Sequence, residues 1–313
     1  MGPCSDSSGT PAAAEKNRNK KRYPERMPFT EDFCKSRDGL RLYYRDYAGD
    51  ASKAPVLCLH GLTRNSRDFA ALAEHIAPGR RVIVPDLRGR GRSQYDPQWM
   101  NYHPGTYVED IWTLLSELSL QRVVVIGTSL GGLMAMLMAA TRPQVLAGVV
   151  LNDIGPEIDP VGVARIQSYA GRLPPVRNWD DAAAQMKMTF GLAFPEYEEP
   201  QWRDFARKSF DEDEGGVPRL AADPKIGDAV RAIPAPPGIS EAMWLAFGQL
   251  RNLPALALRG ATSDLLSAPT FERMQQEVPS LVAVTVANRG HAPQLDEPES
   301  LRAIDAFLAG LRE

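Results

Sequence analysis

The stretch that decides the fold runs Val123-Val124-Val125-Ile126-Gly127-Thr128-Ser129-Leu130-Gly131-Gly132, and a second apolar run follows at residues 133–140. The four β-branched residues at its start predict a buried strand. The second run predicts a buried helix, and only a very tight turn can join the two. The pattern therefore predicts a strand, a sharp turn at Ser129, and a helix whose free N–H groups point toward the serine hydroxyl.

Gly127 and Gly131 flank this turn in the pattern Gly-x-Ser-x-Gly. Small residues are needed at both positions because a sharp strand-to-helix turn brings the flanking backbone into close contact and strains the φ and ψ angles of the serine. The positive end of the helix that begins at Leu130 favours an anion at the same point. The pattern is typical of a nucleophile elbow with Ser129 as the nucleophile.

The composition is that of an ordinary soluble globular protein. Of the 313 residues, 24% are charged and 43% hydrophobic, and the net charge is −3. This balance gives no reason to expect a nucleic-acid partner. Cys4, Cys34 and Cys58 have neither the spacing of a disulfide framework nor that of a metal site. We therefore expect no bound metal and a reducing compartment, the cytoplasm.

The first 27 residues differ in character from the rest of the chain. A Ser-, Gly-, Ala- and Pro-rich start leads into the basic run Lys16-Asn17-Arg18-Asn19-Lys20-Lys21-Arg22, without the apolar segment of a secretory signal. We interpret residues 1–27 as a disordered basic tail. No apolar run in the sequence approaches the roughly 18 residues that span a bilayer, so no membrane association is expected.

Strand and helix patterns alternate from residue 55 onward. Short buried strands are predicted at residues 55–59, 81–85 and 147–151, and again at 254–258 and 281–286. This alternation predicts an α/β fold in which helices cover both faces of a mostly parallel sheet.

The alternation is interrupted between residues 155 and 252. Prolines become frequent there, and the helical patterns are short. We interpret this segment as a helical cap, or lid, inserted into a core formed by residues 28–154 and 253–313.

A serine hydroxyl needs a base to take its proton and a third group to orient that base. The sequence has four histidines: His60, His75, His103 and His291. His291 follows the last predicted strand, above the carboxyl ends of the strands where sites collect, and is the candidate base. His60 ends a core strand and is expected to shape the following turn.

Two aspartates compete for the role of the orienting acid. Asp264 lies just beyond the strand that precedes the His291 strand, and Asp153 follows the strand after Ser129. Either one satisfies the chain order of serine, acid and histidine. We prefer Asp264 and keep Asp153 as the rival.

Acyl transfer also needs two fixed donors for the oxyanion, and backbone N–H groups serve this purpose well. The N–H of Leu130, directly after the serine, is one candidate. The N–H of Leu62, in the turn after the strand that ends at His60, is the other.

With these pieces in place, the chain resembles the α/β-hydrolase fold family over about residues 28–154 and 253–313. The resemblance implies a sheet of about eight strands with the lid inserted after the sixth, a structural role for the turn at 86–93, and no cofactor. The motifs that carry it, in family order, are His60-Gly61-Leu62, Asp86-x-Arg88-Gly89-x-Gly91-x-Ser93, Gly127-x-Ser129-x-Gly131-Gly132, Ser263-Asp264 and Gly290-His291.

Within that family, a serine nucleophile resembles the esterase type, whereas haloalkane dehalogenases and epoxide hydrolases have aspartate there. The segment 290–298 looks like those of esterases, lactonases and carbon–carbon bond hydrolases. The last group usually has Gly-Pro-Gly after His-Gly, and this chain has Thr63-Arg64-Asn65 instead. That departure disfavours carbon–carbon bond cleavage.

We therefore expect a serine hydrolase that cleaves a carboxylic ester, or a lactone, of a small and partly apolar substrate through an acyl-enzyme. One alternative is a carbon–carbon bond hydrolase acting on a vinylogous diketone. Another is a ligand receptor that keeps the fold without turnover. The candidate substrate-binding residues are an arginine on the oxyanion side and four aromatic residues of the lid: Arg64, Trp179, Phe190, Trp202 and Trp244.

Overall fold

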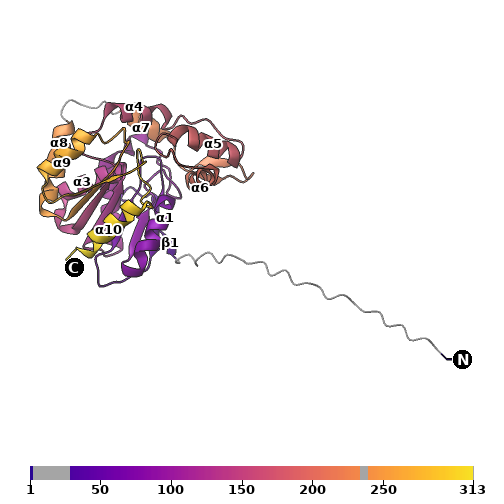
Figure 1. Ribbon diagram of the computed structural model, residues 1–313, viewed down its shortest axis with the longest axis horizontal. Coiled ribbons are helices and arrows are strands. Elements are labelled where there is room, and N and C mark those ends of the chain that lie inside the picture. Colours follow the sequence, from indigo (N-terminus) through magenta and orange to yellow (C-terminus); the bar gives the residue numbers. More distant parts are fainter. Residues whose placement is uncertain (3–28, 233–238, 313) are drawn as a thin grey trace.

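Eight strands form a single sheet in the computed structural model, which describes residues 1–2, 29–232 and 239–312 (Figure 1). The strand order is β1-β2-β4-β3-β5-β6-β9-β10. Strand β2 is antiparallel to both of its neighbours, and every other neighbouring pair is parallel. The strands are β1 (Phe29–Lys35), β2 (Arg41–Tyr47), β3 (Val56–Leu59), β4 (Val82–Pro85), β5 (Val123–Thr128), β6 (Leu146–Asn152), β9 (Ala255–Gly260) and β10 (Val282–Val286). The predicted α/β fold with a mostly parallel sheet is confirmed.

Helices cover both faces of this sheet and bury separate apolar clusters against it. Helices α2, α3, α8 and α9 pack on one face, and α1 and α10 pack on the other. Their bounds are α1 (Ala70–Ile76), α2 (Pro104–Glu117), α3 (Leu130–Thr141), α8 (Ile239–Gly248), α9 (Ala268–Glu277) and α10 (Pro298–Ala309). Short 3₁₀ turns occur at Ser66–Phe69, Ala77–Gly79, Trp99–Asn101, Pro143–Val145 and Gln249–Asn252. The core is thus a three-layer sandwich of helix, sheet and helix.

The chain leaves the sheet between β6 and β9. In Figure 1, α4 and α7 lie at the top of the molecule, while α5 and α6 extend to the right of the sheet. Helices α5 and α6 have an apolar cluster of their own, which includes Phe194 and Trp202. The elements of this segment are α4 (Pro160–Tyr169), α5 (Trp179–Phe190), α6 (Glu199–Ser209), β7 (Phe210–Glu212), β8 (Pro218–Leu220) and α7 (Lys225–Ala232).

Helix α8 lies within the predicted lid segment but packs directly on α3 of the core. Its buried residues Ala246 and Phe247 join the apolar cluster between the sheet and α3. We therefore propose that the lid consists of α4 to α7 with the β7–β8 hairpin, and that the predicted boundary at residue 252 is too late.

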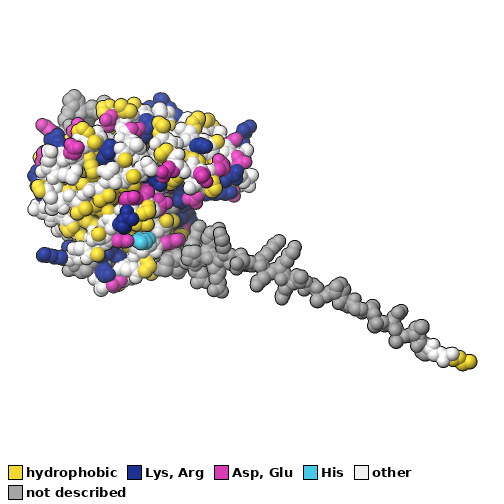
Figure 2. All heavy atoms as spheres, in the orientation of Figure 1, with side chains coloured by type: hydrophobic (Ala, Val, Ile, Leu, Met, Phe, Trp, Pro, Cys, Tyr) yellow, Lys and Arg dark blue, Asp and Glu magenta, His cyan; other side chains and the backbone are white. Residues whose placement is uncertain are grey.

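The predicted disordered tail at residues 1–27 lies outside the described residues, apart from Met1 and Gly2. Among the described helices, none combines the length and the apolar character that a membrane crossing requires. Acidic and basic side chains alternate over the face shown in Figure 2.

Candidate active site

Ser129 lies at the carboxyl end of β5, directly before α3. Its φ of 53° is a backbone conformation that non-glycine residues rarely adopt. Two contacts hold it there: the Ser129 N–H donates to the Asn152 carbonyl at 3.0 Å, and the Ser129 carbonyl accepts from the Gly132 N–H at 2.9 Å. The strained turn carries the serine side chain to the end of the sheet.

The flanking glycines are required by close backbone contacts. A Cβ atom on Gly127 would lie 2.3 Å from the Gly131 carbonyl oxygen, and one on Gly131 would lie 2.0 Å from the Leu59 carbonyl oxygen. No Cβ atom tolerates such distances, so an alanine at Gly127 would force β5 and the start of α3 apart, and one at Gly131 would force the turn away from β3. The structure thus shows the close backbone contacts that were predicted to require glycine on both sides of Ser129.

His291 and Asp153 extend a chain of hydrogen bonds that begins at Ser129. The Oγ of Ser129 lies 2.9 Å from Nε2 of His291, and Nδ1 of His291 lies 2.8 Å from Oδ2 of Asp153. A carboxylate can only accept, so Nδ1 donates to Asp153 and Nε2 is left to accept the serine proton. Asp153 is fully buried, and it also accepts from the N–H of Gly260 at 2.7 Å and the hydroxyl of Ser263 at 2.6 Å. This is the geometry of a nucleophile, its base and an orienting acid.

Asp264, the acid preferred from the sequence, does not contact His291, and that preference is corrected. Its carboxylate instead accepts two hydrogen bonds from Arg165 of α4, the one from Nη2 at 2.8 Å. Partial burial raises the pKa of the Asp264 carboxyl, but the hydrogen bonds and charge of Arg165 outweigh this, and the pKa lies below its ordinary value. Asp153 reaches the histidine because β6 lies between β5 and β9, so its end faces both Ser129 and the His291 loop.

Leu62 and Leu130 are the predicted oxyanion donors. Leu130 is the first residue of α3, so its N–H has no acceptor within the helix. Leu62 lies in the turn after β3, and Arg90 fixes its peptide by donating from Nε to the Leu62 carbonyl at 2.8 Å. That turn lies beside the elbow, since a Cβ atom on Gly61 would be 3.8 Å from Cβ of Ser129. The role of both N–H groups stays a prediction.

His60 holds the same turn in place. Its Nε2 accepts from the Leu87 N–H at 3.0 Å, and its Nδ1 donates to the Gly61 carbonyl at 2.8 Å. Burial lowers the pKa of His60 to about 3, so the imidazole is neutral near pH 7. His60 therefore shapes the turn, as expected, and takes no part in proton transfer.

A cavity of about 60 Å³ opens beside Ser129. The turn after β3, the elbow, the His291 loop and helices α4, α5 and α6 contribute its walls. Two of the predicted substrate-binding residues, Arg64 and Phe190, line it. The space is small and largely aromatic, which suits a compact and partly apolar group.

The Arg64 guanidinium is already engaged on three sides. Nε and Nη2 donate to the Asp68 carboxylate at 2.7 and 2.6 Å, and Nη1 donates to the Ser209 hydroxyl at 2.6 Å. The guanidinium also lies over the ring of Phe205, 4.2 Å from its centre. Arg64 therefore joins the turn after β3 to α6 and forms part of the cavity wall.

The three tryptophans predicted to bind substrate lie away from this cavity. Trp202 is buried inside the lid cluster. The indole N–H of Trp179 donates to Glu212 at 2.6 Å on an exposed part of the lid. Trp244 packs against Phe247 on α8. The sequence alone could not distinguish aromatic residues that line the cavity from those that pack elsewhere. These three tryptophans pack elsewhere.

Several residues of the cavity wall were missed in the sequence. Ile166 and Tyr169 stand three residues apart on α4 and therefore share one helix face, which is the one signal that could have found them. Phe194 and Phe205 approach from other parts of the lid. No local pattern connects these positions, because only the lid packing brings them together.

The turn at residues 86–93 is a structural element, as the resemblance implies. The Asp86 carboxylate accepts from the backbone N–H groups of Ser66 at 2.6 Å and Arg92 at 2.8 Å. Arg88 is buried and donates to the carboxylates of three aspartates. These are Asp38, Asp96 and Asp110. The network fixes the loop after β4 beside the turn after β3.

Comparison with known proteins gives a match to the sequence family described as alpha/beta hydrolase fold, over residues 54–298. That range contains Ser129, Asp153, Asp264 and His291. The chain is also similar to the 3-hydroxybutyrate-oligomer hydrolase of Cupriavidus necator, with 32% identity over 283 residues, which cover 88% of this chain and 96% of the relative.

Two further similarities are consistent with this. A crystal structure of an alpha/beta hydrolase from Novosphingobium aromaticivorans superposes with a TM-score of 0.85 at 42% identity, covering 90% of this chain and 98% of the other. The 2-(acetamidomethylene)succinate hydrolase of Mesorhizobium japonicum is 26% identical over 254 residues, which cover 81% of this chain and 87% of the relative.

Proposed function

The chain belongs to the α/β hydrolase fold family, and from that premise we propose that it is a serine hydrolase that cleaves carboxylic esters through an acyl-enzyme. One observation carries the proposal. Ser129, His291 and Asp153 form a continuous chain of hydrogen bonds of 2.9 and 2.8 Å at a cavity. A serine in this setting is activated by its base, and an ester carbonyl is the electrophile that suits it.

In the first half of the reaction, the Oγ of Ser129 attacks the ester carbonyl carbon while its proton moves to Nε2 of His291. The carbonyl oxygen becomes an oxyanion, for which the N–H groups of Leu62 and Leu130 are the donors. The intermediate then expels the alcohol, which takes the proton from Nε2. The carbon–oxygen bond to the alcohol is broken, and the acyl group stays on Ser129.

In the second half, water replaces the alcohol. Its proton passes to Nε2, its oxygen attacks the acyl carbon, and collapse of the second intermediate returns the proton to Ser129 and releases the carboxylic acid. Asp153 keeps the imidazole in the tautomer that accepts at Nε2 and stabilises the imidazolium that forms in each half. Every proton taken up by His291 is thus given back within one turnover.

For the substrate, we propose esters of short hydroxy acids. The cavity beside Ser129 is about 60 Å³ and is lined by Phe190, Phe194, Phe205 and Tyr169, so it suits a short acyl unit with apolar substituents. The relative from Cupriavidus necator is named for the hydrolysis of 3-hydroxybutyrate oligomers, and this chain aligns with 96% of its length. A short oligoester of this kind combines a small apolar branch with an ester carbonyl, as the cavity requires.

A fluorophosphonate probe tests the nucleophile. The wild-type protein should be labelled, and Ser129→Ala should not, with equal thermal unfolding of the two proteins as the control for folding. Absence of labelling in folded wild-type protein would contradict catalysis and would favour the receptor alternative.

A substrate panel tests the reaction class. The panel should contain p-nitrophenyl acetate, the dimer of 3-hydroxybutyrate, a γ-lactone and a vinylogous diketone, each assayed with wild type and with Ser129→Ala. We expect Ser129-dependent turnover of the two esters at the highest kcat/KM. A clear preference for the diketone would replace the ester proposal with carbon–carbon bond hydrolysis.

A further inference from the structure

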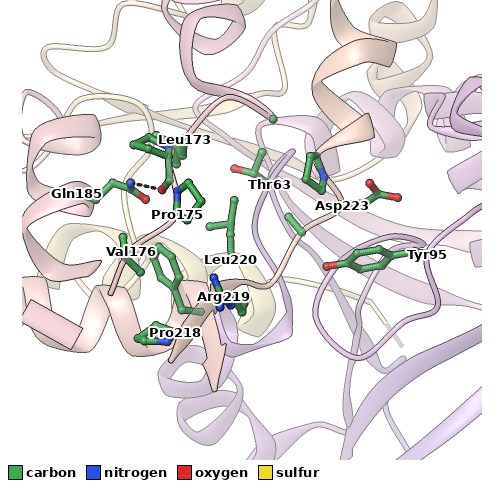
Figure 3. A pocket seen from close by; sticks show the side chains of 15 residues that line it. Thr63, Tyr95, Leu173, Pro175, Val176, Gln185, Pro218, Arg219, Leu220 and Asp223 are labelled. Atoms are coloured by element: carbon green, nitrogen blue, oxygen red, sulfur yellow. Dashed lines mark hydrogen bonds between the residues drawn. The ribbon is translucent and has the colours of Figure 1, made fainter. Parts of the chain in front are cut away.

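A second cavity, of about 230 Å³, is formed by lid residues together with Thr63 and Tyr95 (Figure 3), and Ser129 does not line it. Its walls are mostly apolar but include Gln185 and Arg219, and Thr63, Tyr95 and Asp223 stand together toward the right in Figure 3. The apolar walls are Leu173, Pro174, Pro175, Val176, Phe210 and Leu220. No step of the proposed reaction uses this space.

A third space, of about 10 Å³, shares wall residues with both cavities and therefore lies between them; we call it the constriction. The constriction shares Thr63, Arg64, Tyr169 and Phe190 with the cavity beside Ser129. At its other end the walls shared with the second cavity are Thr63, Gly171, Leu173 and Leu220. The three spaces therefore lie in a row, and Thr63 borders all of them.

The constriction has room for about one water molecule, so a substrate chain can pass only when a wall side chain moves. Leu173 and Leu220 are the candidates for such a movement, because both are only partly buried. Leu220 ends β8, a strand of a two-stranded hairpin. A rotation of this side chain would widen the connection.

The chemistry of the ester decides which part of a substrate points this way. The alcohol oxygen must lie at Nε2 of His291 to receive its proton, so the alcohol part extends on the histidine side. A separate cavity of about 420 Å³, lined by His291, Gly290 and Arg165, is available there. The acyl part must extend in the other direction, toward Thr63 and the constriction.

We propose that the second cavity is an acyl subsite, which holds the hydroxyl-terminal units of a hydroxy-acid oligoester while Leu220 gates the passage to Ser129. This inference rests on the proposed ester hydrolysis and adds to it the direction and length of the substrate. Such a chain carries methyl branches, which suit the apolar walls, and ester oxygens, which can accept hydrogen bonds from the hydroxyl groups of Thr63 and Tyr95. The Asp223 carboxylate already accepts hydrogen bonds from the Tyr102 hydroxyl at 2.6 Å and from the Lys225 N–H at 2.9 Å, so both of its oxygens are engaged within the protein.

The experiment varies the acyl length at a fixed leaving group. The p-nitrophenyl esters of acetic acid, of O-acetylated 3-hydroxybutyrate dimer and of octanoic acid are assayed with wild type, Leu220→Trp and Leu220→Ala. We expect the ratio of kcat/KM for the dimer ester to that for the acetate to fall at least tenfold in Leu220→Trp and to rise several-fold in Leu220→Ala. Leu245→Trp, an exposed leucine on α8 that lines none of these cavities, is the matched control and should keep the wild-type ratio.

Each other outcome overturns part of the inference. An unchanged ratio in both Leu220 variants would remove the subsite. A change that follows the length of the alcohol in a series of alkyl acetates, and not the acyl length, would reverse the direction. An effect on octanoate as large as that on the dimer ester would remove the preference for oligoesters. Failure of the proposed function itself would look different, because Ser129-dependent hydrolysis of the acetate would then be missing in wild type.

Discussion

Asp153 accepts a hydrogen bond from Nδ1 of His291 at 2.8 Å, from the end of the strand that lies between those of Ser129 and Asp264. We therefore expect Asp153→Asn to lower kcat by roughly 10³- to 10⁴-fold, because an amide can stabilise the wrong imidazole tautomer. Asp264→Asn should lower kcat by less than about tenfold, since its partner is Arg165. Steady-state kinetics on p-nitrophenyl acetate, with circular dichroism of both variants, checks this. The reverse ranking of the two variants would restore Asp264 as the acid.

Ser263 acts through Asp153, to which its hydroxyl donates at 2.6 Å. Hydrogen bonds to a charged group contribute about 1.5–3 kcal/mol, so Ser263→Ala should lower kcat by roughly 10- to 100-fold and leave KM nearly unchanged. Ser263→Thr keeps the hydroxyl and should restore most of the rate. The control is Thr262→Ala, since the Thr262 hydroxyl bonds the Arg289 carbonyl and does not reach Asp153. Equal losses in the two alanine variants would argue against a positioning role for Ser263.

The fold could be predicted because its signals are local. Gly127 and Gly131 mark the elbow by steric demands that arise within a few residues and against the adjacent β3, and the apolar runs on either side identify the strand and the helix. His291 could be singled out for the same reason, since it lies in the loop that follows β10 and its position relative to the sheet is inferred from the strand pattern.

The acid and most of the cavity wall depend on partners far apart in the sequence. Asp264 is hydrogen-bonded to Arg165, which lies 99 residues earlier on α4, and not to His291. Asp153 could not be ranked above it, because the sequence does not show that Ser263 and the Gly260 N–H meet its carboxylate. The residues around Trp202 in the sequence likewise do not show that it belongs to a separate apolar cluster in the lid.

Arg88 is the centre of a buried ionic network whose aspartate partners lie outside the motif at residues 86–93. It is only 2% exposed and donates to Asp38, Asp96 and Asp110. Removing one partner from a buried network leaves uncompensated charge, so Arg88→Met should lower the free energy of unfolding by about 3–5 kcal/mol. Arg92→Met is the matched control, because Arg92 is half-exposed in its ion pair with Glu31 and should cost less than about 1 kcal/mol. Urea unfolding of the two variants gives the comparison.

His60 should make stability depend on pH. Its folded pKa of about 3 lies below the ordinary value of 6.5, so between these values the unfolded chain binds the proton more strongly. The free energy of unfolding should therefore fall as the pH is lowered below 6.5, by up to about 1.4 kcal/mol per pH unit from this group. Urea unfolding at pH 7.5, 6.0 and 5.0 measures the slope. His60→Gln should be less stable at pH 7.5 and have a smaller slope; an identical slope would mean that another group causes the loss.

Gly131 packs so closely against the backbone of β3 that no side chain fits at this position. A Cβ atom there would lie 2.0 Å from the Leu59 carbonyl oxygen, so Gly131→Ala must push α3 away from β3 or rotate the turn. Overpacking of this kind costs about 1–3 kcal/mol or more, and the same movement separates Ser129 Oγ from His291 Nε2. We expect a lower free energy of unfolding for Gly131→Ala. We also expect a lower kcat at a temperature where the variant is still fully folded, so that unfolding cannot account for the loss of activity. Gly79→Ala is the control, because no atom lies within 4 Å of the added methyl group. A Gly131→Ala protein with wild-type turnover would show that the close contact at Leu59 is not needed to position the serine.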